Sequence, residues 1–287
     1  MRNSFFKGLF LFLSFVAMSL VYLLLLYVLY KGINSISLEM IFSDSDVLNA
    51  ILLRERVFDG IFPAIVGTLM LIILSMSFAI VFGLSSGIYL SIYAKGRVKN
   101  FLNICFDILA TVPSIIIGLF FLLLSIYLHK KYLDNFLPSL LLSSLALSLL
   151  ILPYFVKNTQ LSLEGIPKHI KLLGLSLGFN RMQNLIYILL PYCSKELLSG
   201  LFLALGRACE DTAVIMLTGA VASAGIATTI FAKYEALPFY IYYISSEYSN
   251  QTELNSAFGA ALILLIIAIS LFVLTNLLQK KIRKKYA

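Results

Sequence analysis

The chain has 287 residues, of which 60% are hydrophobic and 13% are charged, and its formal net charge is +8. Soluble domains carry about a quarter charged residues, so this composition excludes an ordinary soluble domain and is typical of a protein that crosses a membrane several times. Lysines and arginines beside the apolar runs account for the positive charge, so nucleic-acid binding is not indicated.

Six apolar runs approach or exceed the roughly 20 residues that a helix needs to cross a bilayer. The first run is too long for the apolar region of a signal peptide and no cleavage site follows it, so we expect a retained span. Gly83 and Gly87 in the second run have a spacing that lets a neighbouring helix pack closely. The runs lie at about 9–30, 64–94, 103–127, 136–157, 195–220 and 256–278.

Two prolines and one carboxylate interrupt the third and fourth runs. Pro113 and Pro153 remove backbone donors, so we expect bends in both helices. Asp107 lies about one turn inside the third run, where we expect the carboxylate to pair with a nearby lysine or with the loop backbone. We interpret these three residues as structural, and not as contacts for a solute.

The segment at about 158–191, between the fourth and fifth runs, is amphipathic and interrupted by glycines. Pro167 is suited to open a helix, Gly178 is suited to end one with a positive φ, and a second helical run should reach Pro191. The residues alone leave two interpretations open, a helix lying on the inner leaflet and a loop that contacts another protein. Helical spacing places four residues on one side of the first helix: Ile170, Leu173, Gly174 and Leu177.

The fifth run contains charged residues where charge is costly. An arginine near the bilayer centre costs about 2.5–3.5 kcal/mol, so Arg207 should face a bundle interior or a water-filled cavity. In a continuous helix Arg207 and Asp211 share one face and can pair, with Glu210 also within reach. Because a guanidinium suits an oxyanion, we predict that Arg207, Glu210, Asp211 and Thr212 line a solute pathway. A structural ion pair is the alternative, and two carboxylates beside one arginine make the site locally acidic.

Lysine and arginine are unevenly distributed between the two sets of loops. With the N-terminus inside, 15 of them lie in inner segments and 6 in outer segments. Positively charged loops remain in the cytoplasm, so we expect both termini to be cytoplasmic. The basic tail at 280–287 is then expected to anchor the chain at the lipid headgroups.

Several stretches carry the pattern of a known family. In the 158–191 loop, Gly178 and Leu190-Pro191 match the glycine and the Leu-Pro pair of the ABC-permease loop signature, while Leu172-Leu173-Gly174 stand where that signature has Glu-Ala-Ala. Together with four other stretches, this loop resembles the A-type (PstA-like) permease subunit of the phosphate-specific ABC importer. The likeness extends from about 35 to 278, and the other stretches are 59–69, 107–119, 204–213 and 237–242.

One of these stretches departs from the family pattern. The family motif in the fifth span is Arg-Ala-x-Gly-Glu-Thr, and here Glu210 stands at the glycine position and Asp211 at the glutamate position. The resemblance implies that the arginine of this motif meets phosphate and that the 158–191 loop contacts an ATPase. For that contact it points to Pro167, Ile170, Leu173, Gly174, Leu177 and Gly178.

The resemblance implies an all-α integral membrane protein of six transmembrane helices, with a type I ABC importer (MetI-like) core preceded by one N-terminal helix. Accordingly, 1–60 would form the N-terminal helix and outer loop, 61–279 the permease core and 280–287 the cytoplasmic tail. The implied partners are a C-type permease, a dimer of ATP-binding subunits and a periplasmic or extracytoplasmic phosphate-binding protein. The implied location is the bacterial cytoplasmic (inner) membrane.

Other functions remain open at this point. The chain has no G-x-x-x-x-G-K-[ST] phosphate loop, so ATP is expected on a partner and no cofactor on this chain. The cargo could be another oxyanion such as molybdate or sulfate. A secondary transporter would show internal symmetry, and an enzyme or metal site would show clustered ligating or catalytic residues; we find neither pattern. We therefore expect no catalytic residue and no metal on this chain.

Overall fold

The computed structural model describes residues 2–43, 45–51, 57, 60–131 and 137–286. In these ranges the chain is helical, with one isolated bridge between Ala220 and Tyr234. The long helices are α1 (Arg2–Ile33), α4 (Phe62–Ile88), α5 (Gly96–Thr111), α6 (Ser114–Lys131), α7 (Leu140–Glu164), α11 (Ser194–Glu210) and α14 (Gln251–Tyr286). The short ones are α2 (Leu38–Phe42), α3 (Val47–Ile51), α8 (Lys168–Ser176), α9 (Arg181–Asn184), α10 (Leu190–Tyr192), α12 (Ala213–Thr218) and α13 (Leu237–Glu247). Two π-helical turns, η1 (Tyr89–Tyr93) and η2 (Leu185–Leu189), extend α4 and join α9 to α10.

Five helices in the described ranges are long and apolar enough to span a membrane, and a bent pair could supply a sixth. The five are α1, α4 with η1, α6, α7 and α14. The bent pair joins 181–192 to α11 at an angle of 69°. The prediction of six membrane spans in an all-α fold is therefore confirmed, although two of the expected runs are broken.

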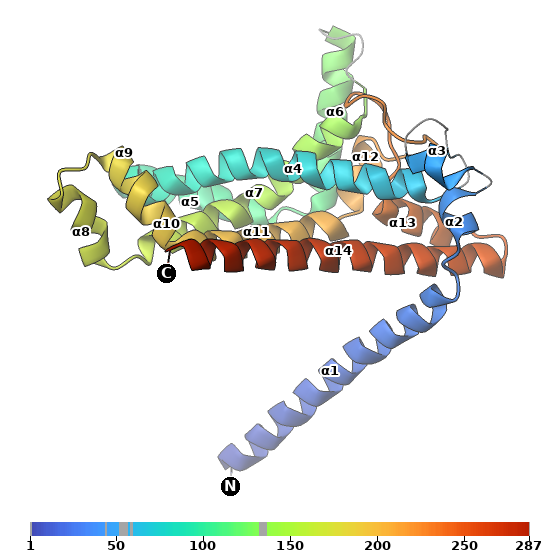
Figure 1. Cartoon of the computed structure of the whole chain (residues 1–287), viewed down its shortest axis with the longest axis horizontal. Coiled ribbons are helices and arrows are strands. Elements are labelled where there is room, and N and C mark those ends of the chain that lie inside the picture. Colours follow the sequence, from blue (N-terminus) through green and yellow to red (C-terminus); the bar gives the residue numbers. More distant parts are fainter. Residues whose placement is uncertain (1, 44, 52–56, 58–59, 132–136, 287) are drawn as a thin grey trace.

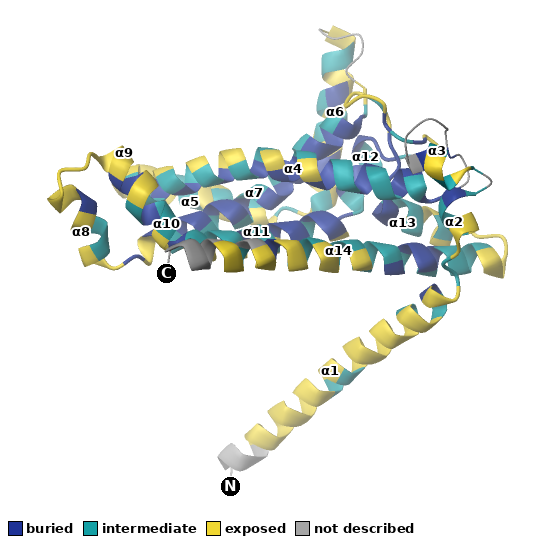
Figure 2. Cartoon of the chain, in the orientation of Figure 1, coloured by how far each residue is buried: buried dark blue, intermediate teal, exposed yellow. Residues whose placement is uncertain are grey.

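The core of the bundle is the pair formed by α4 and α7. Gly83 and Gly87 lie at this interface, where an added Cβ would come within 2.7 Å of Phe155 and 2.5 Å of Thr159. The close approach expected from the glycine spacing is confirmed, and α7 is its partner. Figure 2 shows that α7 is largely buried. α7 also continues through Pro153 without a break.

The third apolar run is broken, whereas the sequence predicted only a bend. α5 ends at Thr111 and α6 begins at Ser114, with Val112 in an extended conformation (ψ 127°). The following Pro113 disfavours the helical conformation for Val112, which explains the break. α6 then leaves the bundle at a steep angle to α4 and α7 (Figure 1), so only α6 is a candidate span in this region.

α5 turns its polar side toward α7. Lys157 contacts Asp107 at 3.0 Å and donates to Asn103 at 3.1 Å, and Lys99 contacts Glu164 at 2.7 Å. The pairing predicted for Asp107 is thus confirmed. The exposed side of α5 is apolar, with Val98, Phe101, Ile104 and Ile108. A helix with its polar side inward is suited to a surface that meets lipid or another membrane protein.

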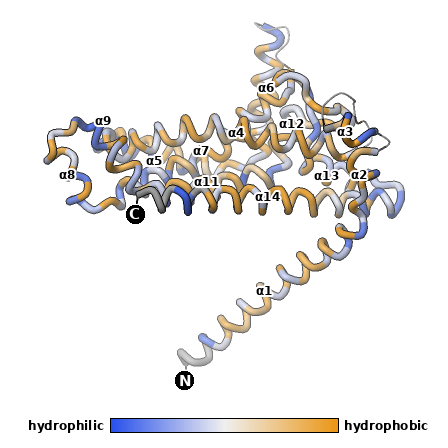
Figure 3. Tube along the Cα trace, viewed as in Figure 1, coloured by the Kyte–Doolittle hydropathy of each residue, from blue (hydrophilic) through white to orange (hydrophobic). Residues whose placement is uncertain are grey.

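α1 stands apart from the bundle, and its main contact among the described helices is with α14 (Figure 1). Near the end of α1, Tyr27 packs edge-on against Phe258, with 5.6 Å between the ring centroids. Most of the rest of α1 is exposed and apolar (Figure 3). Such a surface is stable only in lipid or against another membrane protein. α14 continues to Tyr286, so the basic tail expected at 280–287 begins as part of this helix.

The start of α7 is covered by a loop at 219–236. The backbone N–H groups at 139–141 donate at 2.8–3.0 Å to the carbonyls of Thr218, Ile230 and Ala232. A helix start leaves such donors without intrahelical partners, and here the last residue of α12 and the loop satisfy them. The loop therefore fixes the end of α7 that lies away from α8.

Glu235 of this loop is buried outside the membrane-spanning helices. Its Oε1 accepts the N–H of Gly225 at 2.6 Å. Burial raises the pKa of the Glu235 carboxyl, and hydrogen bonds from the N–H groups of Gly225 and Ala224 oppose that rise. A raised pKa in the folded state favours the protonated form. The contribution of this carboxyl to stability is therefore present at acidic pH and is lost as the pH rises through the folded-state pKa.

We expect Glu235→Gln to stabilise the chain relative to the native protein at neutral pH, because the amide oxygen keeps the hydrogen bond from Gly225 without burying a charge. The difference should shrink as the pH falls through the raised folded-state pKa and should be gone below the ordinary glutamate value of 4.5. Thermal unfolding of the purified chain in detergent, followed as a function of pH, measures this difference. The exposed Glu196→Gln is the matched control, and a pH-independent difference for Glu235→Gln would contradict the assignment.

Candidate functional site

The charged residues of the fifth run lie where its helix breaks. α11 ends at Glu210, Asp211 is extended (ψ 115°), and α12 begins at Ala213. The Asp211 carboxylate is buried and accepts the N–H of Val214 at 2.9 Å. A carboxylate in this position accepts a hydrogen bond from a free N–H at the start of the helix, and its negative charge interacts favourably with the helix dipole. Asp211, which we predicted to pair with Arg207, therefore stabilises the break between α11 and α12.

Arg207 pairs with Glu210 and not with Asp211. Arg207 Nη1 lies 2.8 Å from Glu210 Oε1, at the i,i+3 spacing on α11. The predicted i,i+4 pair with Asp211 is wrong, because the backbone leaves the helix between the two residues. The secondary expectation, that Glu210 is within reach, is confirmed. Thr212 lies next to them, half-buried, and its hydroxyl makes no hydrogen bond within the described part of the chain.

The Arg207–Glu210 pair lies on an open side of the molecule. The side chains are 39% and 62% exposed, whereas Ala204, Leu205 and Ala208 on the same helix are buried in the core. A charged pair facing lipid is costly, so this side of α11 requires water or another protein against it. Arg207 and Glu210 therefore form a charged surface that the described part of the chain leaves exposed, with the half-buried Thr212 next to it in the sequence.

The loop at 158–191 has the two-helix form that the sequence predicted. Its first residues complete α7, Pro167 directly precedes α8, and Gly178 has a φ of +86° that ends the first helical segment. Asn180 then begins α9 with a capping box, in which its side chain and that of Gln183 exchange backbone hydrogen bonds of 2.8 and 2.9 Å. The Asn-x-x-Gln spacing could have revealed this helix start in the sequence.

The prediction that Ile170, Leu173, Gly174 and Leu177 lie on one side of the first helix of this loop is only partly confirmed. Gly174 is buried and Ile170 packs against the local apolar cluster. Leu173 and Leu177, however, are 50% and 69% exposed, and Leu177 lies beyond the last residue of α8. These two leucines therefore form an exposed apolar surface at the tip of the loop.

Asn184 is a structural residue of this loop that sequence reasoning did not single out. It is buried, and its Nδ2 donates to the carbonyl of Lys171 at 2.8 Å, which joins α9 to α8. An added Cβ on Gly174 would overlap the Asn184 side chain, so only glycine permits this contact. Nothing in the sequence pattern places 174 against 184, since the contact depends on how the two helices fold back.

The sequence matches the family described as the binding-protein-dependent transport system inner membrane component, over residues 79–284. The chain belongs to this permease family. The match covers all of the helices from α5 to α13, and with them both the break after Arg207 and the 158–191 loop. This assignment confirms the expected class of membrane permease and the family to which the motifs pointed.

Curated relatives of this permease are 26–30% identical to it over the aligned residues. A probable ABC transporter permease, YqgI of Bacillus subtilis, is 26% identical over 67% of this chain and 62% of its own length. A phosphate transport system permease, PstA 1 of Mycobacterium tuberculosis, is 30% identical over 75% of this chain and 69% of its own. The probable PstA of Methanocaldococcus jannaschii is 27% identical over 75% and 74%.

Among solved structures, a chain of the MetNI methionine ABC transporter in inward-facing conformations has the same fold. Its TM-score with this permease is 0.57 at 18% sequence identity, and the superposition covers 83% of this chain and 99% of that one. At this identity the likeness establishes the fold alone. It confirms the MetI-like core expected from the sequence, and α1 precedes the core in the chain.

Proposed function

We propose that this permease is the A-type membrane subunit of an ATP-driven phosphate importer and forms one half of its translocation pathway. The observation that carries this proposal is the Arg207–Glu210 pair on the open side of α11. A guanidinium is the side chain best matched to phosphate, since it donates several hydrogen bonds in one plane. The names of relatives that are phosphate transport permeases support phosphate as the cargo.

We infer that a second membrane subunit covers the exposed side of α11. A C-type permease placed there would close the pathway and keep Arg207 and Glu210 away from lipid. With Asp211 used to cap α12, a single carboxylate competes for Arg207, which makes the site less acidic than the sequence suggested. Phosphate would then displace Glu210 from the guanidinium on arrival, and Glu210 would return on release.

The tip of the 158–191 loop supplies a surface for a dimer of ATP-binding subunits. Its exposed leucines Leu173 and Leu177 offer apolar contact, and the Asn184 hydrogen bond makes α8 and α9 one unit that can transmit a push to α11. In this arrangement the loop and both termini lie in the cytoplasm, the chain crosses the inner membrane, and an extracytoplasmic phosphate-binding protein delivers phosphate to the opposite end.

The test is uptake of labelled phosphate into proteoliposomes that contain this chain, its C-type partner and the ATPase, with the binding protein outside and ATP inside. We expect accumulation that requires every component. Unlabelled phosphate should compete, while molybdate and sulfate should not. Competition by either of those oxyanions alone would assign a different cargo. Uptake driven by an ion gradient without ATP would instead indicate a secondary transporter and contradict the proposal.

A further inference from the structure

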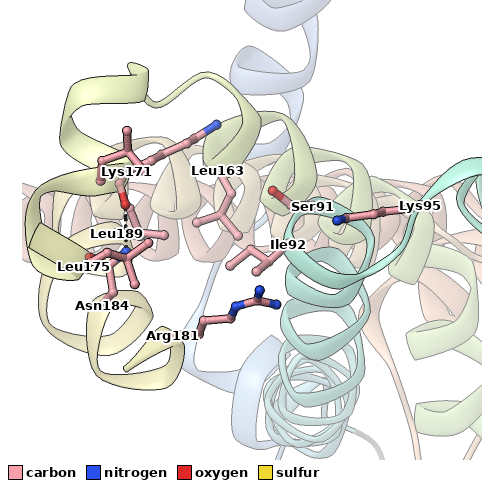
Figure 4. Close-up of a pocket in the computed structure, with 10 residues that line it drawn as sticks. Ser91, Ile92, Lys95, Leu163, Lys171, Leu175, Arg181, Asn184 and Leu189 are labelled. Carbon is pink, nitrogen blue, oxygen red and sulfur yellow. Dashed lines mark hydrogen bonds between the residues drawn. The ribbon is translucent and has the colours of Figure 1, made fainter. Parts of the chain in front are cut away.

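A cavity of about 310 Å³ lies between the 158–191 loop and the ends of two spanning helices (Figure 4). Ser91 and Ile92 in the last turns of the α4–η1 span form one wall, and Leu163 at the end of α7 forms another. α8 and α9 close the remaining sides. Because both spans end here, the cavity is at the depth where hydrocarbon gives way to lipid headgroups.

Positive charge dominates the lining. Lys95, Lys171 and Arg181 line the cavity, and none of the described lining residues is acidic. The Lys171 ammonium donates to the carbonyl of Glu164 at 2.9 Å, and the Glu164 carboxylate pairs with Lys99. Lys95 and Arg181 form no ion pair with the described residues. In Figure 4 the Arg181 guanidinium points toward Ile92 and the Lys95 ammonium toward Ser91.

Apart from Ser91 and Asn184, the remaining lining residues are apolar, which favours an anion that carries an apolar chain. Ile92, Leu163, Leu175 and Leu189 are all part of the wall. A free phosphate ion gains nothing from leucine, whereas a phospholipid brings both a phosphodiester and an acyl chain. The wall is also fixed in place, since Asn184 is buried and bonds the Lys171 carbonyl at 2.8 Å.

We infer that this cavity binds the headgroup of an anionic phospholipid from the inner leaflet. Its phosphodiester lies between Arg181 and Lys95, and its acyl chain follows the leucines. Basic pockets at the cytoplasmic ends of spanning helices are suited to such headgroups. The bound lipid joins η1 and α5 to α9, so it links the spans to the 158–191 loop. The site depends on these helix ends lying at a membrane surface and not on which solute the permease carries.

The experiment is native mass spectrometry of the full chain in detergent, titrated with phosphatidylglycerol or with phosphatidylcholine of identical acyl chains. We expect the chain to retain phosphatidylglycerol preferentially. Arg181→Gln and Lys95→Gln should each reduce that preference about fivefold. A basic residue near the membrane surface contributes about 1 kcal/mol to the binding of an anionic lipid, which corresponds to this factor. Lys195→Gln, an exposed lysine at the same end but outside the cavity, should leave the preference unchanged.

Three results would overturn the inference. The first is equal retention of both lipids by the native chain. The second is an equal loss of preference in Lys195→Gln and Arg181→Gln. The third is displacement of the lipid by millimolar inorganic phosphate, because the cavity would then be a site for the free ion. Unchanged thermal unfolding of Arg181→Gln confirms that the loop is still folded when its lipid binding is measured.

Discussion

Replacing Arg207 by glutamine is expected to reduce phosphate uptake by roughly a hundredfold or more, while the complex still assembles. Loss of one charged partner from a desolvated anion contact costs about 2–5 kcal/mol, and about 3 kcal/mol corresponds to this factor. Glutamine keeps much of the side-chain length but offers no charge to the phosphate oxygens. Uptake by reconstituted complexes measures the loss, and co-purification of the partner subunits reports assembly.

Glu210→Gln is the matched variant for that experiment. It removes the carboxylate that lies 2.8 Å from Arg207 and leaves the guanidinium free to hold phosphate. We expect a lower KM for phosphate together with a lower maximal rate, because release becomes slower. An ion pair with a purely structural role would behave differently, since both variants would then lower stability and uptake to the same extent. Normal uptake by Arg207→Gln would remove Arg207 from the pathway altogether.

Replacing both Leu173 and Leu177 by serine is expected to separate the permease from its ATPase. Burying one leucine against a partner contributes about 1.5–3 kcal/mol, so each substitution should weaken the contact at least about tenfold. The two side chains are 50% and 69% exposed, so the isolated chain should unfold at an unchanged temperature. Co-purification of the ATPase and ATP-dependent uptake should both be lost.

Leu161→Ser provides the control for the loop. Leu161 is 65% exposed on α7 but lies outside α8 and its flanking turns, so its replacement should leave ATPase binding unchanged. If the loop instead lies on the inner leaflet as an interfacial helix, the double serine variant will keep the ATPase and change only the membrane contact. That outcome would exclude the proposed mechanical link.

Hydropathy and glycine spacing were sufficient to predict much of this molecule. Apolar runs located the spans, because the cost of placing polar backbone and charge in lipid acts locally on each segment. The spacing of Gly83 and Gly87 predicted a close helix contact, and Gly178 predicted the end of α8 through its positive φ. These signals depend on residues near one another in the chain, so the sequence displays them directly.

Where an apolar run breaks was harder to predict. From the sequence we predicted that the helix continues after Arg207, and therefore that Arg207 pairs with Asp211. In the structure the helix ends at Glu210, and Asp211 caps α12. An apolar run has the same hydropathy whether its helix is continuous or turned. The start of α7 contacts α12 from a distant part of the chain, since the N–H of Ser139 donates to the carbonyl of Thr218 at 2.9 Å.

By itself, then, the sequence determined the class of the protein, the number of its spans and the place of its loop, since burial in lipid and backbone conformation are set over one or two turns. Only the tertiary structure decided which carboxylate meets Arg207, which leucines of the 158–191 loop remain exposed and that Asn184 joins α8 to α9. Those features depend on where distant segments meet, and the free energy of such contacts is shared by residues far apart in the chain.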